Sequence, residues 1–242
     1  IMCKILAFTN ATQLKINNKL LNVLKSAVTM ASDKDGFGYS IQGAKGFYGE
    51  KTLDVSSKFF SWFDTSDTTR SQPFVQLNQD SFGKKSPTTG GLIAHGRLST
   101  NTKNLSCTHP YVTQKYSLIH NGVVQDLADE PIVCKTPNDT EILLRYWERD
   151  GISGVTKNCA GYYALAIQES KSLLHIVKDS MAMLHVAWCK SIDSWIFATT
   201  KEIIFKVAKD MKWEVDPPEA VKDNVWLIFS GNECISEEEI TP

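Results

Sequence analysis

Four short apolar segments follow one another closely in the second half of the sequence, and this spacing restricts the fold more than any other feature. The segments span 163–167, 173–177, 184–188 and 194–198. About three to six residues connect each segment to the next, whereas a parallel crossover needs a dozen or more. Antiparallel strands are therefore predicted here, with a final strand at 225–229.

Helical spacing of apolar residues is found in fewer places. Within 14–30 the apolar residues recur at intervals of three and four, which predicts an amphipathic helix. A central helix is predicted between Asp139 and Gly151, after Thr136-Pro137-Asn138, and a short helix at 202–209. Strands that outnumber helices indicate an α+β layered protein, and no linker divides the chain, so 1–242 is predicted to be a single domain.

Composition and charge argue against several other classes of protein. The 242 residues are 42% hydrophobic and 22% charged, as in an ordinary globular protein. The 26 basic residues nearly balance the 27 acidic ones, which argues against a nucleic-acid partner. No apolar run approaches the ~18 residues of a membrane helix, and no secretory signal is recognisable. A cytoplasmic protein without a membrane or nucleic-acid partner is therefore predicted.

The six cysteines are scattered along the chain and form no CxxC pair. This pattern indicates neither a zinc site nor a redox motif, so no metal or other cofactor is predicted and the thiols are expected to be reduced.

The segment 56–90 is the least regular part of the sequence and is predicted to be a long surface excursion. Its aromatic cluster, Phe59, Phe60, Trp62 and Phe63, is expected either to pack under this loop or to form a contact patch.

Cys3 is the first candidate for chemistry because it lies next to Met2. Removal of Met2 would place a thiol and a free α-amine on the same residue. An α-amine with a pKa of about 7.7–8.0 is suited to deprotonating a nucleophile near neutral pH. The alternative interpretation is a buried cysteine that packs as a small apolar group.

Three further candidates each have a structural alternative. Arg97 either grips a carboxylate through two parallel hydrogen bonds or forms a surface salt bridge. Asn121 and Gly122 either donate to an oxyanion or form a hairpin turn after the strand that ends at His120. Asp139 either pairs with a substrate ammonium or caps the central helix.

The order of these motifs along the chain resembles that of the class II glutamine amidotransferases, which are N-terminal-nucleophile (Ntn) hydrolases. The most specific matches are Ala94-His95-Gly96-Arg97-Leu98-Ser99-Thr100, Leu118-Ile119-His120-Asn121-Gly122 and Asn138-Asp139-Thr140-Glu141. The segment at 161–167 also matches a strand that follows these motifs in that family. The sequence Asp35-Gly36-Phe37-Gly38 resembles a motif of the short, stand-alone members.

The resemblance implies a four-layer αββα sandwich in which two mainly antiparallel sheets lie between helices. It also implies that chain 1–242 is one type 2 glutamine amidotransferase domain. By resemblance, the Cys3 thiolate attacks the side-chain amide of glutamine, and Asn121 and Gly122 hold the oxyanion. A γ-glutamyl thioester then gives glutamate and ammonia.

The same resemblance assigns substrate binding to three residues. Arg97 would bind the α-carboxylate, Asp139 would bind the α-ammonium, and Thr100 would line the pocket. The ammonia is expected to pass to a separate synthase subunit. The alternative is a stand-alone amidohydrolase that acts on a γ-glutamyl compound.

Ile1 and Met2 set a condition on this activity, because an acylated Cys3 nitrogen is an amide and cannot act as a base. The protein is therefore expected to be active only if Cys3 becomes the N-terminus. The two residues are interpreted as a remnant of expression or a precursor segment. Otherwise the chain is a catalytically silent homologue that serves as a binding or scaffold subunit.

Overall fold

The structure is a computed structural model that describes residues 3–14, 16–29, 35–43, 46–53, 55, 88–98, 104–129 and 131–241. Residues 56–87 of the excursion predicted at 56–90, including its aromatic cluster, lie outside the described residues. Residues 88–90 begin a strand, so the last part of that prediction is wrong.

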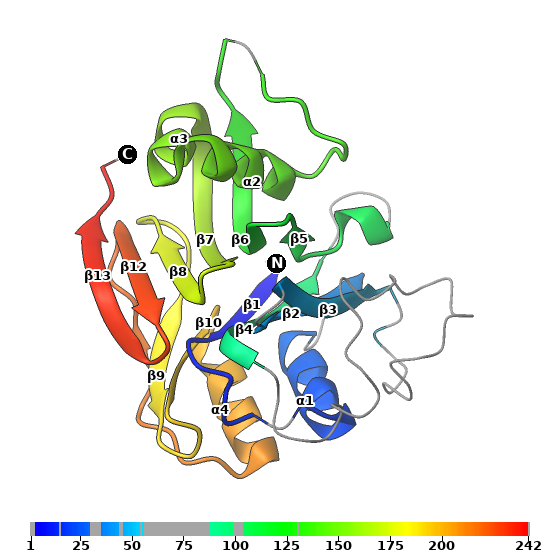
Figure 1. Cartoon of the computed structure of the whole chain (residues 1–242), viewed down its shortest axis with the longest axis vertical. Coiled ribbons are helices and arrows are strands. Elements are labelled where there is room, and N and C mark those ends of the chain that lie inside the picture. The colour runs from blue at the N-terminus through cyan, green and yellow to red at the C-terminus, as the bar shows by residue number, and fades with distance from the viewer. Residues whose placement is uncertain are drawn as a thin grey trace.

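Two antiparallel sheets form the centre of the molecule (Figure 1). The first has the order β11-β9-β10-β1-β4-β2-β3. Its strands are β1 (Lys4–Phe8), β2 (Gly36–Gly43), β3 (Gly46–Thr52), β4 (Thr88–Arg97), β9 (His185–Cys189), β10 (Ser194–Ala198) and β11 (Glu219–Ala220). The second has the order β13-β12-β8-β7-β6-β5. Its strands are β5 (Tyr111–Val112), β6 (Tyr116–Asp126), β7 (Cys159–Glu169), β8 (Leu173–Lys178), β12 (Val225–Ser230) and β13 (Glu233–Glu239).

Helices cover the outer face of each sheet. Helices α1 (Asn18–Val28) and α4 (Lys201–Met211) pack on the first sheet, at the lower side of Figure 1. Helices α2 (Asp139–Asp150) and α3 (Ile152–Asn158) pack on the second, at the upper side. A short 3-10 helix, η2, spans Leu105–Cys107. The predicted α+β sandwich with four layers is confirmed.

Alternation along β1 shows how the sequence builds these layers. Leu6 and Phe8 face the helices, whereas Ile5 and Ala7 face the second sheet, and all four are fully buried or nearly so. Each large apolar side chain buried in this way contributes roughly 1.5–3 kcal/mol. Because both faces of β1 are buried, the strand is apolar throughout.

The predicted helices begin where side chains cap them. The Asn17 side chain accepts a hydrogen bond from the Leu20 N–H at 3.0 Å, so the helix predicted at 14–30 spans 18–28. The central helix is confirmed, and Gly151, with φ +63°, terminates it.

The predicted end of the strand at His120 is wrong. β6 continues through Asn121 and Gly122 to Asp126, and β7 pairs with it from Tyr116 onwards along its whole length. Continuous pairing with a neighbouring strand keeps the Asn-Gly pair extended, although this dipeptide favours a turn in isolation.

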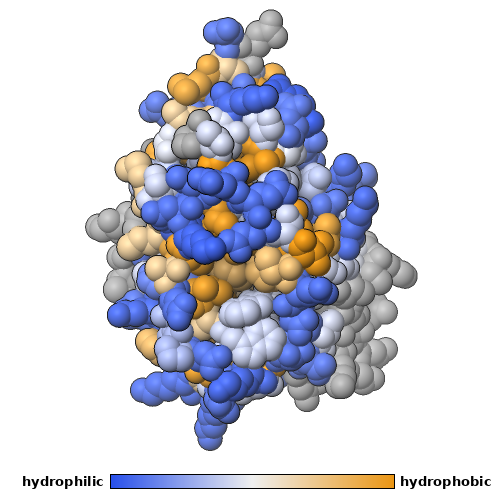
Figure 2. Space-filling model, turned by 90° about the vertical axis from the view of Figure 1, so that its left-hand side faces the viewer, coloured by the Kyte–Doolittle hydropathy of each residue, from blue (hydrophilic) through white to orange (hydrophobic). Residues whose placement is uncertain are grey.

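The outer edge of the second sheet is acidic. Four glutamates of β13 are exposed, and charges on an edge strand discourage pairing with another chain. Figure 2 shows the side on which this edge lies, where hydrophilic residues predominate and hydrophobic residues gather across the middle. Within the ranges described, no helix combines the length and apolar character needed to span a membrane.

Candidate functional site

A cavity of about 390 Å³ lies where β1 starts, β4 ends and α2 begins against β6. Five of the six predicted site residues line it: Cys3, Arg97, Asn121, Gly122 and Asp139. Thr100, the sixth, lies outside the described residues. Four separate parts of the chain thus contribute to one pocket, whose volume is typical of small-molecule sites.

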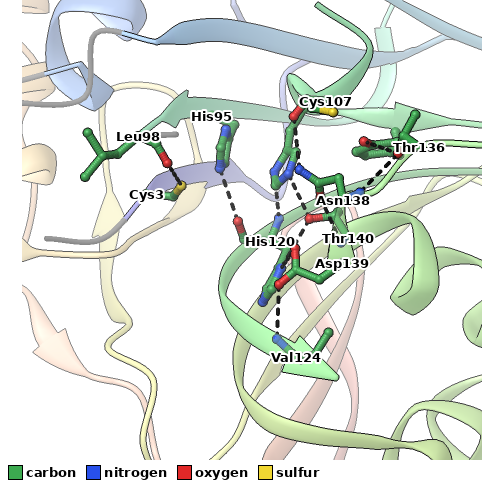
Figure 3. Close-up of polar contacts among 12 residues, drawn as sticks. Cys3, His95, Leu98, Cys107, His120, Val124, Thr136, Asn138, Asp139 and Thr140 are labelled. Carbon is green, nitrogen blue, oxygen red and sulfur yellow. Dashed lines mark hydrogen bonds and ion pairs between the residues drawn. The ribbon is translucent and has the colours of Figure 1, made fainter. Parts of the chain in front are cut away.

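Cys3 reaches the pocket because of the pairing between β1 and β4. Lys4 lies opposite Gly96, so the residue before β1 meets the end of β4. The half-buried Cys3 thiol donates to the Leu98 carbonyl oxygen at 3.5 Å (Figure 3). Cys3 therefore lies beside Arg97 across the strand pair.

Arg97 is the last residue of β4, and its side chain is buried. Its Nη1 has no hydrogen-bond partner among the described residues. A buried charge is costly unless it is paired. This guanidinium is therefore suited to an anionic group of a ligand in the cavity.

Asn121 and Gly122 occupy the middle of β6. The Asn121 side chain is fully buried, and neither its Oδ1 nor its Nδ2 has a partner among the residues described. Gly122 has φ +155°, and a Cβ there would lie 2.0 Å from the carbonyl oxygen of Tyr162. Only glycine fits this position, and its backbone is free of a side chain on the cavity wall.

Asp139 is the first residue of α2, but it is not the cap. Asn138 is the cap, because its side chain accepts from the Thr140 N–H at 2.9 Å. One carboxylate oxygen of Asp139 accepts from the Val124 N–H of β6 at 3.0 Å. The carboxylate is partly exposed to the cavity and stabilised by the helix N-terminus, so it is suited to a cationic group.

Three histidines that the sequence analysis did not place together meet at the inner end of the site. The rings of His95 and His109 have centroids 3.9 Å apart, and His95 Nε2 lies 3.1 Å from the His120 carbonyl oxygen. Burial lowers the pKa of His95 to about 3 and also lowers the pKa values of His109 and His120. For two of them a signal was present in the sequence, because His95 and His120 belong to motifs already singled out.

These histidines do not form a metal centre. The residues that the structure describes contain no group of three or more His, Cys, Asp or Glu side chains that could hold a metal ion. The imidazole nitrogens instead bond to one another's backbone and to Thr140.

Comparisons with known proteins show what this chain and its fold are similar to. The family model described as a glutamine amidotransferase domain matches residues 95–206 of this chain. The fold is similar to that of an allosteric regulatory enzyme of purine biosynthesis, with a TM-score of 0.69 at 15% identity. It is also similar to glutamine phosphoribosylpyrophosphate amidotransferase from B. subtilis, with a TM-score of 0.67 at 14% identity. Each match covers 99% of this chain and 49% of the other, so the chain spans about half the length of these proteins.

A third solved structure covers both chains almost completely. It is a glutamine aminotransferase class-II domain protein from Silicibacter pomeroyi, with a TM-score of 0.50 at 12% identity over 99% of this chain and 100% of that one. No curated protein sequence matches the chain. The predicted resemblance to glutamine amidotransferases is confirmed over residues 95–206, and the predicted fold class by the similarity to the first two solved structures.

Proposed function

We propose that this protein releases ammonia from the side-chain amide of glutamine, with Cys3 as the N-terminal nucleophile. One observation supports this most strongly. The cavity combines a thiol with a buried guanidinium and a buried amide, neither of which is fully paired within the described residues. Glutamine offers an anionic carboxylate, a cationic ammonium and an electrophilic amide, which complement Arg97, Asp139 and Cys3.

In the proposed reaction the free α-amine of Cys3 takes the thiol proton, and the thiolate attacks the amide carbon of the substrate. The carbonyl electrons move to oxygen, and the Asn121 amide and the Gly122 N–H donate to this oxyanion. The C–N bond then breaks as the α-ammonium returns its proton to the leaving nitrogen, which departs as ammonia. Water, deprotonated by the same amine, hydrolyses the γ-glutamyl thioester to glutamate and restores the thiol.

Substrate orientation is assigned to the two charged groups. Arg97 would bind the α-carboxylate and Asp139 the α-ammonium, which holds the amide carbon near the Cys3 sulfur. Thr100 is proposed to line the same pocket. This half-reaction uses only side chains and backbone of the chain, together with water.

The remaining assignments extend this proposal. We infer that 1–242 works as one type 2 domain and passes ammonia to a separate synthase subunit, since amidotransfer needs an acceptor site. A cytoplasmic location stays a prediction. The activity requires that Ile1 and Met2 be absent, because only a free Cys3 amine can move the proton.

The test is glutamate and ammonia release by protein produced with Met directly before Cys3. Intact mass establishes whether Cys3 is the first residue. We expect turnover of glutamine by that form, and a loss of about 10³-fold or more in Cys3→Ala. An unchanged circular dichroism spectrum would show that this variant keeps the fold.

Three results would contradict the proposal. Activity retained by Cys3→Ala excludes Cys3 as nucleophile. Hydrolysis of γ-glutamyl amides but not of glutamine would favour the stand-alone amidohydrolase. A protein with a free Cys3 that hydrolyses neither would be a silent homologue.

A further inference from the structure

The three buried histidines are connected to the start of α2 by a single hydroxyl group. Thr140 Oγ1 lies 2.8 Å from His109 Nε2 and 3.2 Å from His120 Nδ1 (Figure 3). The backbone N–H of His120 donates to His109 Nδ1 at 3.4 Å, and the His120 carbonyl oxygen contacts His95 Nε2 at 3.1 Å. The network therefore holds the backbone of the residue directly before Asn121.

The partners determine the direction of all but one of these hydrogen bonds. A carbonyl oxygen only accepts, so His95 Nε2 carries its proton. His109 Nδ1 accepts from a backbone N–H, so the proton of this neutral ring is on Nε2 and is donated to Thr140. The remaining contact joins Thr140 Oγ1 and His120 Nδ1. We expect the hydroxyl to donate its own proton here, which leaves the His120 proton on Nε2. All three rings are thus expected to be Nε2–H tautomers.

The network replaces a missing neighbour strand. Among the described residues β5 pairs with β6 only at Ser117 and Leu118, so beyond this point side chains bond to the outer edge of β6. Histidines hold both backbone groups of His120, and Asp139 holds the Val124 N–H. In an antiparallel strand every second residue directs its backbone groups to the same edge, so the Gly122 N–H lies between two anchored positions.

The His120 ring also packs directly beside Gly122. A Cβ on Gly122 would lie 2.7 Å from His120 Nε2, so the ring occupies the space next to the Gly122 Cα. His120 is fully buried, with 2% of its surface exposed. Reorienting the peptide at Gly122 would therefore require the ring to move, and Thr140 prevents this.

We propose that His120, locked by the Thr140 hydroxyl, is a positioning residue that holds the donors at 121–122 in place for the oxyanion. The inference rests on the proposed glutamine hydrolysis and adds to it a residue that does not touch the substrate. It also connects the two halves of the site, because Thr140 follows Asp139 in the first turn of α2. Donors held in advance cost no reorganisation during the reaction.

Burial of the rings is consistent with this role. Desolvation lowers the pKa values of all three histidines, so the rings stay neutral near pH 7 and keep one tautomer. A protonated His109 would lose the lone pair that accepts from the His120 N–H.

The experiment compares Thr140→Val with Thr140→Ser in protein that begins at Cys3. Valine keeps the shape but removes the hydroxyl, whereas serine keeps it. We expect Thr140→Val to lower kcat for glutamine about 10- to 100-fold, less than the ~10²–10³-fold loss from deleting an oxyanion donor itself. KM should change less than about threefold, because the donors act in the transition state. Thr140→Ser should keep kcat within about threefold of wild type.

Thr9→Val is the matched control. Thr9 is also buried, and its hydroxyl accepts from the Trp195 N–H at 3.1 Å, at the end of β1 away from Cys3. This variant loses a buried hydroxyl without any link to 121–122, so its kcat per folded molecule should equal that of wild type. Equal kcat losses in Thr140→Val and Thr9→Val would overturn the inference, as would wild-type kcat in Thr140→Val.

A second measurement covers the case in which Thr140→Val does not fold. Nitrogen-15 NMR of the wild-type imidazoles should show neutral Nε2–H tautomers for His95, His109 and His120. An Nδ1–H tautomer at His120 would contradict the network. A wild-type protein that is unreactive with glutamine would instead refute the proposed function, which separates the two failures.

Discussion

Two polar clusters of the second sheet, one around His175 and one at the site, differ in how completely their side chains are paired. In the first cluster, His175 donates from Nε2 to Glu169 at 3.1 Å and accepts from the Trp226 indole N–H at 3.2 Å. At the site, the buried amide of Asn121 has no partner among the described residues. The Nη1 of Arg97 likewise has no hydrogen-bond partner among the described residues. Asn121 lies opposite Ala164 of β7 and His175 lies opposite Ile167, so the two are three residues or roughly 10 Å apart along that strand.

We interpret the cluster around His175 as structural and the unpaired groups that line the cavity as ligand-binding. An unpaired buried polar group costs about 1–3 kcal/mol, whereas a paired one is close to neutral or favourable. The cluster around His175 is complete and packed, with the Trp147 ring 5.2 Å from the imidazole. In the proposed function a substrate supplies the missing partners of the cavity groups. Mutation should therefore affect the two clusters differently.

The largest effect should come from the unpaired amide. Asn121→Ala removes the proposed donor to the oxyanion and no hydrogen bond to a described residue, so kcat for glutamine should fall about 10²–10³-fold. The free energy of unfolding, measured in urea, should stay the same or rise. A large loss of stability would contradict the view that this amide lacks partners.

Gln42→Ala is the matched control for this prediction. Its buried amide is fully paired, because Oε1 accepts from the Gly91 N–H and Nε2 donates to the carbonyl oxygens of Glu169 and Leu173. This variant should lose stability and keep kcat.

Arg97→Ala should act on substrate binding. Loss of a charge-assisted pair with the α-carboxylate, worth about 1.5–3 kcal/mol, should raise KM for glutamine roughly 10- to 100-fold. The free energy of unfolding should change less than the free energy of substrate binding, because the substitution removes an incompletely paired charge. Steady-state kinetics checks this, and an unchanged KM would remove Arg97 from the binding site.

His175→Leu tests the paired cluster around His175. It leaves the Trp226 N–H and the Glu169 carboxylate without their partner, so unfolding should become easier by about 1–3 kcal/mol. The kcat of the folded protein should not change. Urea titration measures the free energy of unfolding, and initial rates on the same sample measure kcat. A loss of kcat without loss of stability would contradict a structural role for the cluster around His175.

Acid should gradually lower the free energy of unfolding through buried histidines of both clusters, His95 at the site and His175 away from it. Burial lowers the pKa of His95 to about 3 and lowers that of His175, whereas in the unfolded chain both groups titrate near 6.5. The unfolded state therefore binds more protons below pH 6.5, so stability falls as the pH drops. His95 alone should contribute a loss of about 2 kcal/mol between pH 6.5 and 5. Urea midpoints across this range test the sign, and a rise in stability on acidification would contradict it.

Much of the fold could be predicted from local pattern because burial leaves a regular trace in the sequence. The central helix and the strands at 163–167 and 194–198 lie where apolar periodicity placed them. Cys3 could be selected as a site candidate because it follows Met2, and Asn121 because its amide can donate to an oxyanion. The structure brings both to one cavity.

Only the tertiary structure decided how these residues meet. Pairing with β7 kept Asn121 and Gly122 extended where the dipeptide alone favours a turn. Packing of α2 on the second sheet made Asp139 a partner of the Val124 N–H and brought Thr140 between His109 and His120. Sequence periodicity reports whether a residue is buried, but its partner is chosen by contacts between elements far apart in the chain.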